Sequence, residues 1–273
     1  MRGSPGLDRR AVMCHRKFMI YVGTSGFSYD DWRGHFYPAD LPKNQFLTYY
    51  AQRLNALEVN FTYYRMPTAR TMAGLADKSE GRVNFVVKLH GAMTHERTAA
   101  PEDYRAFLEA CAPLCEQNHL GALLAQFPFS FHCNEANRDY LKNLRERLGE
   151  SDVVVEMRNA RWLKQETFEL LKDLRFGWCN VDEPQLKGLL PPTAVATSDI
   201  GYVRFHGRKS QQWFQHEHAY ERDNYLYTQD ELAEWTPKIK MLENLTKRTY
   251  AFTNNHFESK AVTNALMLLD LLR

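Results

Sequence analysis

The stretch Val153-Val154-Val155-Glu156-Met157-Arg158 starts with three apolar residues and ends with two charged residues that are two positions apart. Side chains two apart on a strand point to the same face, so Glu156 and Arg158 are expected to point the same way. A strand that served only to fold would have valine, isoleucine or leucine at these positions. The stretch therefore predicts a strand whose far end belongs to a polar site.

The same pattern, apolar first and polar at the end, returns along the chain. It is present in residues 57–62, 85–90, 123–127, 178–182, 202–206 and 252–256. We predict strands over residues 18–23, 57–63, 83–90, 121–127, 152–158, 176–182, 202–206 and 249–254. Helical patterns with apolar residues three and four apart lie between them, at 46–57, 68–78, 102–118, 134–148, 163–174, 229–245 and 259–272. The segment 183–201 holds three prolines and can carry only a short helix.

This alternation predicts an α/β fold, namely a single (β/α)8 barrel of the TIM type. It would have eight parallel strands, an outer ring of helices and a short or irregular sixth helix. In such a barrel the carboxyl ends of the strands meet at one mouth, where active sites are built. The alternative is a doubly wound open sheet, which usually has a glycine-rich nucleotide turn after the first strand. Gly23-Thr24-Ser25-Gly26 lacks that GxGxxG spacing, which favours the barrel.

The length and composition agree with one soluble domain. The chain has 273 residues, of which 44% are hydrophobic and 25% are charged, and one barrel of roughly 250 residues would use nearly all of them. We therefore expect a single barrel domain over residues 18–273. Residues 1–17 lack periodicity, and Met19 directly precedes the first strand, so we expect a disordered or unused extension there.

Charge and cysteine content suggest where the protein works and what it meets. The formal net charge is +2, which does not by itself favour nucleic acid or an anionic membrane as a partner. The five cysteines form no CxxC motif, and no apolar run is long enough to span a bilayer. These features, with no signal peptide, predict a cytoplasmic protein without a membrane partner.

The strand ends supply groups for acid–base chemistry and for holding an anion. Glu58 and Glu156 are the general acid–base candidates, with Lys88 beside them. Lys88, Arg158, Arg204 and Arg208 together would suit a small anion, because arginine grips a carboxylate or phosphate with two hydrogen bonds. We expect the substrate-binding residues to be Asn60, Gln126, Arg158, Asp182, Arg204, His206, Arg208, Asn254 and Asn255. Helix capping is an equal alternative for Asn255.

Two further features are open to more than one interpretation. Trp32, in an aromatic loop after the first strand, could stack on a sugar, base or ring of a substrate, or could pack in a lid. The ligand types for zinc or manganese are also present, at Glu58, His90, Glu156, Asp182, His206 and His256. The interleaved cations disfavour a bound divalent ion, so we predict no metal ligand and no cofactor, with a zinc or manganese ion as the alternative. The polar positions could also satisfy one another as ion pairs inside the barrel, without a function.

At these same segments the chain resembles the YecE-like family of domains of unknown function. The matching residues are Gly23-Thr24-Ser25-Gly26-Phe27-Ser28-Tyr29, Trp32, Gly34, Phe36-Tyr37-Pro38, Glu58-Val59-Asn60-Phe61-Thr62-Tyr63-Tyr64, Pro67, Val87-Lys88, Thr94-His95, Gln126-Phe127-Pro128, Ser130-Phe131, Glu156-Met157-Arg158, Trp162, Val203-Arg204-Phe205-His206-Gly207-Arg208, Asn254-Asn255-His256 and Lys260-Ala261. The resemblance covers residues 20–272 and implies a TIM-type barrel. It implies little about activity, because the family is named for lacking one.

The resemblance also selects one residue that spacing alone does not. The family's histidine after the third strand corresponds to His95 rather than to His90, so His95 is added to the catalytic candidates. The chain departs from the family at Phe27, where tryptophan is usual, and at Asn159, Arg161 and Ser259, near which histidine, serine and glycine are usual. These departures weaken any role carried over to the loop after the fifth strand.

Three functions remain as hypotheses. The first is an enzyme, with hydrolase or lyase chemistry favoured weakly, that acts on a small phosphate- or carboxylate-bearing molecule at the barrel mouth. The second is a metal-dependent phosphodiesterase or endonuclease-like protein that acts on nucleic acid, by analogy with nucleases on similar barrels. The third is a protein that binds a ligand without turnover.

Overall fold

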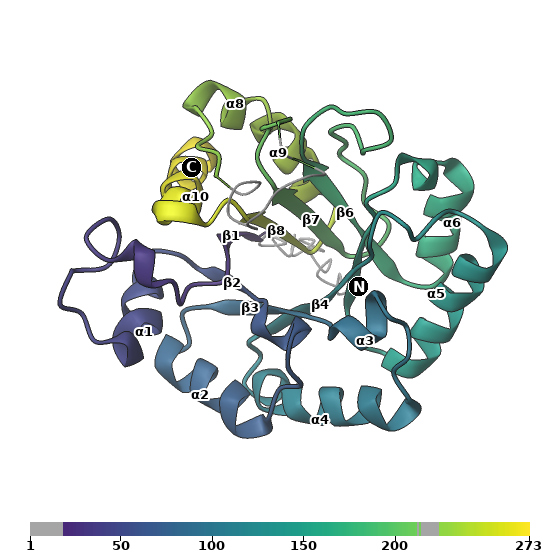
Figure 1. Cartoon of the computed structure of the whole chain (residues 1–273), viewed down its shortest axis with the longest axis horizontal. Helices are drawn as coiled ribbons and strands as arrows, with labels where there is room; N and C mark the ends of the chain where they lie inside the picture. Colours follow the sequence, from purple (N-terminus) through teal and green to yellow (C-terminus); the bar gives the residue numbers. More distant parts are fainter. Residues whose placement is uncertain (1–18, 212, 214–223) are drawn as a thin grey trace, which may run out of the picture.

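The computed structural model describes residues 19–211, 213 and 224–273, and its core is a closed barrel of parallel strands (Figure 1). Each strand is hydrogen-bonded to the next in chain order, and the last pairs with the first. The strands are β1 (Met19–Ser25), β2 (Ala56–Val59), β3 (Asn84–Lys88), β4 (Leu120–Gln126), β5 (Val153–Glu156), β6 (Phe176–Asp182), β7 (Ile200–Phe205) and β8 (Arg248–Thr253). The predicted TIM-type barrel is confirmed.

Helices surround the strands as an outer ring (Figure 1). They are α1 (Phe46–Tyr50), α2 (Ala69–Ser79), α3 (Gly91–Thr94), α4 (Pro101–Glu116), α5 (Glu135–Leu148), α6 (Gln165–Asp173), α8 (Gln229–Ala233), α9 (Thr236–Leu245) and α10 (Lys260–Leu272), with 3-10 turns at Asp30–Trp32, Lys43–Gln45, Phe61–Tyr63, Ala160–Trp162 and Phe257–Ser259. Residues 183–199, between β6 and β7, form turns and irregular loop, as the prolines in this segment lead one to expect. The predicted extension at residues 1–17 lies outside the described residues.

Local sequence signals set the helix ends. Asn134 caps α5 by accepting a hydrogen bond from the Asn137 amide, and Gly149 takes a positive φ of 56° at its other end. Thr228 and Glu231 form a capping box at the start of α8. Pro101 occupies the first turn of α4, where its missing N–H costs nothing. The ends of these helices are thus largely determined by short-range chemistry.

Several predicted elements are shorter than expected; the helix expected at 46–57 ends at Tyr50, and the strand expected over 152–158 ends at Glu156. The strand expected over 57–63 ends at Val59, because the Thr62 hydroxyl donates to the Val59 and Lys88 carbonyls and the chain turns there. The helix expected over 229–245 is two helices. Pro237 in the first turn of α9 cannot continue α8, since proline lacks the N–H and crowds the preceding turn.

The barrel interior is filled mainly by aromatic side chains at its amino-terminal end. Tyr21 stacks on Tyr250 with ring centroids 5.0 Å apart, and Phe252 packs against Tyr250 and Tyr202. The Tyr250 hydroxyl donates to Asn84 Oδ1 at 2.6 Å. Gly121 leaves room for this pair, because a Cβ there would lie 2.1 Å from Asn84 Oδ1. The rings close the amino-terminal end of the barrel and leave polar side chains at the other end.

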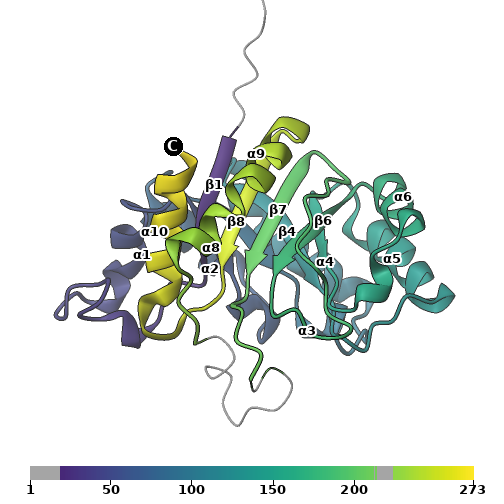
Figure 2. The same ribbon diagram turned by 90° about the horizontal axis from the view of Figure 1, so that it is seen from above.

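All strands run the same way, so their carboxyl ends lie on one face. The arrowheads of β7 and β8 point to the lower edge of Figure 2, the edge where α3 lies. The last inward-facing side chains of the strands come together there, and Ser25 of β1 is in register with Glu58 of β2, as Gln126 of β4 is with Glu156 of β5. None of the helices in the described residues is long and apolar enough to cross a membrane.

Candidate functional site

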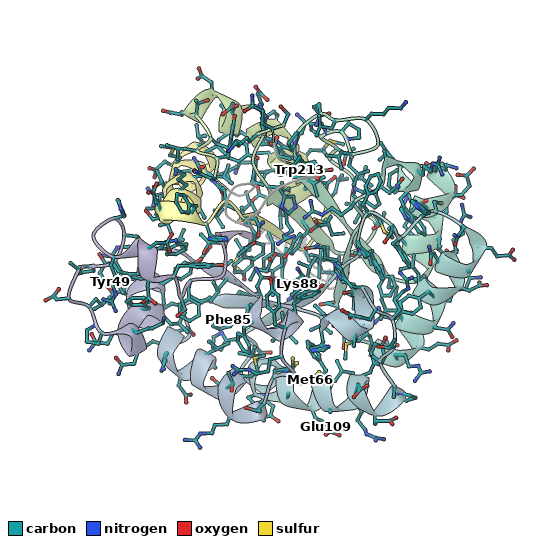
Figure 3. The ribbon with its side chains drawn as sticks, in the orientation of Figure 1. Tyr49, Met66, Phe85, Lys88, Glu109 and Trp213 are labelled. Atoms are coloured by element: carbon teal, nitrogen blue, oxygen red, sulfur yellow. The ribbon has the colours of Figure 1, made fainter. Side chains whose placement is uncertain are left out.

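A cavity of about 480 Å³ opens at the carboxyl ends of the strands. Its lining is Tyr29, Asn60, Tyr64, Lys88, His95, Gln126, Pro128, Phe129, Arg158, Leu189, Arg204, Trp213, Asn254 and His256. Figure 3 shows Lys88 near the centre of the ring of strands, with Phe85, from the same strand, farther out. This position matches the expectation that the inward-facing ends of the strands build one polar site. We refer to this cavity below as the central pocket.

Arg204 forms the floor of the central pocket and joins strands from opposite sides of the barrel. Its Nη2 lies 2.6 Å from Glu58 Oε1, and its Nη1 lies 2.6 Å from Glu156 Oε2. It also donates to Gln126 Oε1 at 3.1 Å and to Asn254 Oδ1 at 3.2 Å. All its partners come from different strands or strand ends. The buried guanidinium is therefore held in one orientation by several charge-assisted hydrogen bonds.

Glu58 and Glu156 lie beneath this floor and do not line the central pocket. Both side chains are fully buried. The Tyr202 hydroxyl donates to Glu58 Oε2 at 2.9 Å, so both oxygens of Glu58 have partners. Burial alone would raise the pKa of Glu156, but Arg158 and Arg204 outweigh it and hold that pKa well below its usual range. The geometry thus makes Glu156 a permanent anion that positions two arginines, which is not what a general acid at neutral pH requires.

Arg158 extends the charge network toward the rim. Its Nε lies 2.8 Å from Glu156 Oε1, and its Nη1 donates to Glu183 Oε2 at 3.0 Å. Glu183 also accepts a hydrogen bond from the Leu190 amide. Burial raises the pKa of Glu183 to about 7, although Arg158 opposes the shift. At neutral pH this carboxyl is close to half protonated, so Arg158 is only partly neutralised by it.

Lys88 is the cation of the central pocket that lacks a carboxylate partner. Its Nζ donates to Gln126 Oε1 at 2.9 Å and lies 4.6 Å from the centre of the Tyr63 ring. No carboxylate of the described residues lies within 4.0 Å of it. Burial lowers the pKa of Lys88 to about 8, and Arg204 adds to this, while Glu58 and Glu156 act against it. A sizeable fraction of Lys88 is therefore uncharged near neutral pH, unlike an exposed lysine.

Two histidines lie beside these cations. His95 follows α3 and lines the central pocket, with Nδ1 3.0 Å from the Thr94 hydroxyl. Burial, assisted by Lys88, lowers the pKa of His95. His206 is fully buried, with Nε2 3.2 Å from Glu156 Oε1, and burial and Arg158 lower its pKa well below the usual value. Both rings are thus neutral at neutral pH, and only His95 reaches the central pocket.

Three amides complete the polar lining. Gln126 and Asn254 accept hydrogen bonds from Lys88 or Arg204. Their amide nitrogens are not used in these contacts. Asn60 Oδ1 is buried and has no hydrogen-bond partner within the described part of the chain. A buried carbonyl oxygen without a partner is costly, so a donor from a bound molecule would be accommodated well here.

Asp182 and Arg208 lie outside the central pocket, contrary to the expected arrangement. On β6 it is Cys179 that approaches the interior, with Sγ 3.9 Å from Glu156 Oε2. Asp182 instead faces the helices, where it accepts hydrogen bonds from Arg208, Tyr227 and Trp235. The alternation on β6 is therefore shifted by one residue from the one we assumed. Arg208 and Asp182 border a separate cavity of about 380 Å³.

Asn255 and Trp32 are also displaced from the expected site. Asn255 donates to the Tyr225 carbonyl and to Asn264 Oδ1, behind β8. Trp32 is fully buried, donates from Nε1 to the His256 carbonyl at 2.7 Å and packs against Tyr37. The aromatic side chains that do line the central pocket are Tyr29, Tyr64, Phe129 and Trp213. These side chains, rather than Trp32, are therefore the aromatic groups placed to contact a molecule in the central pocket.

Sequence reasoning missed two members of the network. Glu183 follows β6 directly. Because the inward and outward positions of that strand were assigned one residue out of phase, Asp182 was predicted in its place. Tyr202 lies in the middle of β7, and its sequence position gives no sign that its hydroxyl reaches Glu58 across the barrel. The signal for Glu183 was present, since two consecutive carboxylates end the strand and only one can face outward.

The side chains of the described residues are arranged for ion pairs and not for a metal ion. Within residues 19–211, 213 and 224–273, no three His, Cys, Asp or Glu side chains are placed to hold one metal ion. The carboxylates directly beneath the central pocket are Glu58 and Glu156. Their oxygens pair with Arg204 and Arg158 or accept a hydrogen bond from Tyr202. The donor set thus fits ion pairing better than coordination of a divalent ion.

A closed parallel barrel with a polar pocket at its carboxyl-terminal mouth defines a protein of the TIM-barrel class. Within that class the chain belongs to the family DUF72, described as a protein of unknown function, whose model matches residues 21–273. It is 29% identical over 272 residues to the UPF0759 protein YunF of Bacillus subtilis (strain 168), covering 93% of this chain and 95% of YunF. The expectation of a barrel family without an assigned activity is confirmed.

Solved structures of the same family agree with the fold. A DUF72 family protein of Thermotoga maritima MSB8 is 39% identical, with a TM-score of 0.86 over 93% of this chain and 99% of that one. A DUF72 family protein of Enterococcus faecalis V583 is 27% identical, with a TM-score of 0.83 over 93% of this chain and 95% of that one. The barrel is therefore common to proteins that differ at most of their positions.

Proposed function

We propose that the protein is an enzyme, of the YecE-like type that its motifs indicate, acting in the cytoplasm on a small anionic substrate. The substrate carries a carboxylate or phosphate and binds in the central pocket, where the protein acts on it by general acid–base chemistry. One observation carries the proposal. Lys88 faces the central pocket with a neutral amide as its hydrogen-bond acceptor, and no carboxylate of the described residues is within salt-bridge distance.

The charge balance supports an anion as the ligand. Glu58 and Glu156 neutralise Arg204, and Glu156 is shared with Arg158. Glu183, the other partner of Arg158, has a pKa of about 7 and so carries only part of a charge. The positive charge of Lys88 is therefore left without a counter-charge among these groups. A carboxylate or phosphate beside Lys88 and Arg158 would supply it.

The same groups can move protons. An acid or base works best when its pKa lies near the working pH, and the pKa of Lys88 is about 8. His95 lines the same cavity and is neutral, so it can accept a proton. In this proposal Glu58 and Glu156 hold Arg204 and Arg158 in place, and the proton-transfer role expected of the two carboxylates passes to Lys88 and His95.

An enzyme is favoured over a binding protein because several pKa values depart from the ordinary ones in and beside the central pocket. The pKa values of Lys88 and His95, which line the pocket, are lowered, and the pKa of Glu183, which bonds the pocket residue Arg158, is raised. Such clustering is typical of catalytic sites, although ion-pair networks also produce it. The metal-dependent alternative has less support, since the carboxylates it would use are occupied by arginines.

The test is ligand-dependent stability of chelator-treated protein. Inorganic phosphate should raise the thermal midpoint by mass action on the folded state. Arg158→Met should reduce the shift, and Arg175→Met, which removes an exposed arginine paired with Glu150, should leave it unchanged. If chelation abolishes the shift and manganese or zinc restores it, the metal-dependent alternative replaces this proposal. If no anion changes the midpoint, the polar groups are a structural network.

A further inference from the structure

We infer that Lys88 is a covalent nucleophile, which forms an imine with the carbonyl carbon of a small oxo compound bearing a carboxylate or phosphate. This inference rests on the anion site proposed above and names the substrate class and the chemical step. Imine formation requires an amine that faces the substrate, that can lose its proton, and that lies beside a group able to hold the anionic end. The surroundings of Lys88 meet each requirement.

The first requirement is position. Lys88 is the last residue of β3, and its side chain lines the central pocket from the wall of the barrel. Its Nζ is held between the Gln126 side-chain oxygen, at 2.9 Å, and the face of the Tyr63 ring, whose centre is at 4.6 Å. A rigid strand end fixes the amine better than a loop would. Figure 3 shows the side chain near the barrel axis, where a bound molecule would sit.

The second requirement is an amine free to deprotonate. A carboxylate partner would favour the protonated amine, and other lysines have one: Lys142 pairs with Asp139, and Lys260 pairs with Glu258. Lys88 has no such partner among the described residues, and burial with Arg204 nearby lowers its pKa to about 8. Desolvation beside a second cation is a known way to make a lysine nucleophilic. At pH 7.5 its neutral fraction should exceed that of an exposed lysine roughly a hundredfold.

The third requirement is a holder for the anionic end of the substrate. Arg158 and Arg204 line the same cavity. The contacts of Arg158 with Glu156 and Glu183 use its Nε and Nη1, so among the described residues Nη2 is left for a ligand. Asn60 Oδ1, buried without a partner within the described residues, could accept a hydrogen bond from a substrate hydroxyl.

The reaction can be written with all atoms balanced. The lone pair of neutral Nζ attacks the carbonyl carbon, and the carbon–oxygen π pair moves to the oxygen, which takes up a proton. Nζ then loses a proton to neutral His95, which lines the same cavity. The hydroxyl leaves with that proton as water while the nitrogen lone pair forms the C=N bond. One amine, one carbonyl and one proton thus give one iminium ion and one water, and the iminium draws electrons from a neighbouring C–H or C–C bond.

The experiment traps the imine in the full-length protein. Pyruvate and dihydroxyacetone phosphate serve as the two probes, one with a carboxylate and one with a phosphate, each followed by sodium borohydride at pH 7.5. With pyruvate we expect a mass gain of one pyruvic acid less one oxygen atom, mapped by peptide sequencing to residue 88. Lys88→Arg should lose the label and Lys142→Arg should keep it. Mapping in the wild-type protein decides the question even if Lys88→Arg fails to fold.

Failure of the imine and failure of the anion site give different results. Lactate and phosphate have the same kinds of charge as the probes but no carbonyl. If they raise the thermal midpoint while neither probe labels residue 88 above the level of other lysines, the imine is refuted and the anion site stands. If no anion raises the midpoint and residue 88 is unlabelled, both proposals fall. Preferential labelling of residue 88 by either probe supports the imine and identifies which anionic group the site prefers.

Discussion

Arg204 of β7 and Glu58 of β2 meet across the barrel, with Nη2 of the arginine 2.6 Å from Oε1 of the glutamate, although they are 146 residues apart in the chain. Both side chains are buried, and the same arginine also binds Glu156 of β5. Strands on opposite sides of the barrel share no backbone hydrogen bonds. The arginine therefore supplies a link that the sheet itself cannot, and it does so directly beneath the central pocket.

Replacing this arginine should destabilise the protein severely. Arg204→Met keeps the bulk but leaves Glu58 and Glu156 buried without their shared cation, a loss that typically costs ~3–5 kcal/mol. Urea unfolding of the variant measures it. Arg175→Met is the matched control, because it removes an arginine whose partner Glu150 is exposed, and it should have little effect. Equal midpoints for the two variants would show that the central ion pairs do not hold the barrel together.

Glu183 should make stability depend on pH in the neutral range. Its folded-state pKa of about 7 lies above the ordinary 4.5, so the folded protein keeps a proton that the unfolded chain releases between these values. The contribution of Glu183 to the free energy of unfolding is therefore fully present below about pH 4.5, and it is lost as pH rises through about 7. Its full size is about 3 kcal/mol for this shift.

The Glu183→Gln variant isolates this contribution. It lacks the titrating group, so the wild-type protein should lose free energy of unfolding relative to the variant as pH rises from about 5 to about 8. Glu150→Gln, at an exposed site whose pKa is lowered by Arg175, should show no trend over the same range. A wild-type protein that parallels Glu183→Gln at every pH would rule out the shifted carboxyl.

Lys88 should react at lower pH than the other lysines. Reductive methylation with labelled formaldehyde, followed by nuclear magnetic resonance, reports the protonation of each amine. The signal from Lys88 should titrate with a pKa of about 8, because burial and Arg204 disfavour its charge. Phosphate in the central pocket should raise that pKa, since a nearby anion favours the protonated form. A midpoint equal to that of exposed Lys142 would contradict both the shift and the nucleophile inferred from it.

Gly121 should tolerate no side chain. A Cβ there would lie 2.1 Å from Asn84 Oδ1 and 2.3 Å from the Tyr250 hydroxyl, inside the packed amino-terminal end of the barrel. Gly121→Ala should therefore cost ~1–3 kcal/mol through overpacking. Gly74→Ala in α2 meets nothing within 4 Å and should gain about 0.5–1 kcal/mol from helix propensity. Thermal unfolding compares the two variants. Midpoints that shift in the same direction would contradict tight packing around Gly121.

The sequence predicted the barrel well because its signal is local and repeated. Each strand shows its apolar run and polar end within a few residues. The inward positions predicted at the ends of β2 to β5, and Arg204 of β7, lie in or directly under the central pocket. The prediction was wrong on β6, where Asn180 bonds with Tyr202 and Val195 and Asp182 faces Trp235. Both faces of that strand are buried, and polar residues on either face give the same pattern in the sequence.

The spacing of residues in the sequence does not show how deeply a side chain is buried or which group it bonds with. Period-two alternation shows that Glu58 and Lys88 point inward, but it does not show that the first lies beneath Arg204 while the second faces a cavity. Trp32 and Asn255 look the same in sequence as residues that line a pocket, and their hydrogen bonds to distant backbone or amide groups place them in the packing. His95 was identified only through the family resemblance, since it follows α3 rather than a strand.

The charged groups beneath the central pocket alternate along one line, from Glu58 through Arg204, Glu156 and Arg158 to Glu183. Each interior member touches two neighbours of opposite sign, so changing one residue alters the environment of the next. Effects of single substitutions along this line will not add, and a second change can restore what the first removed. Sequence divergence among related barrels is thus expected to proceed here by compensating pairs, with an acid and a base gained or lost together.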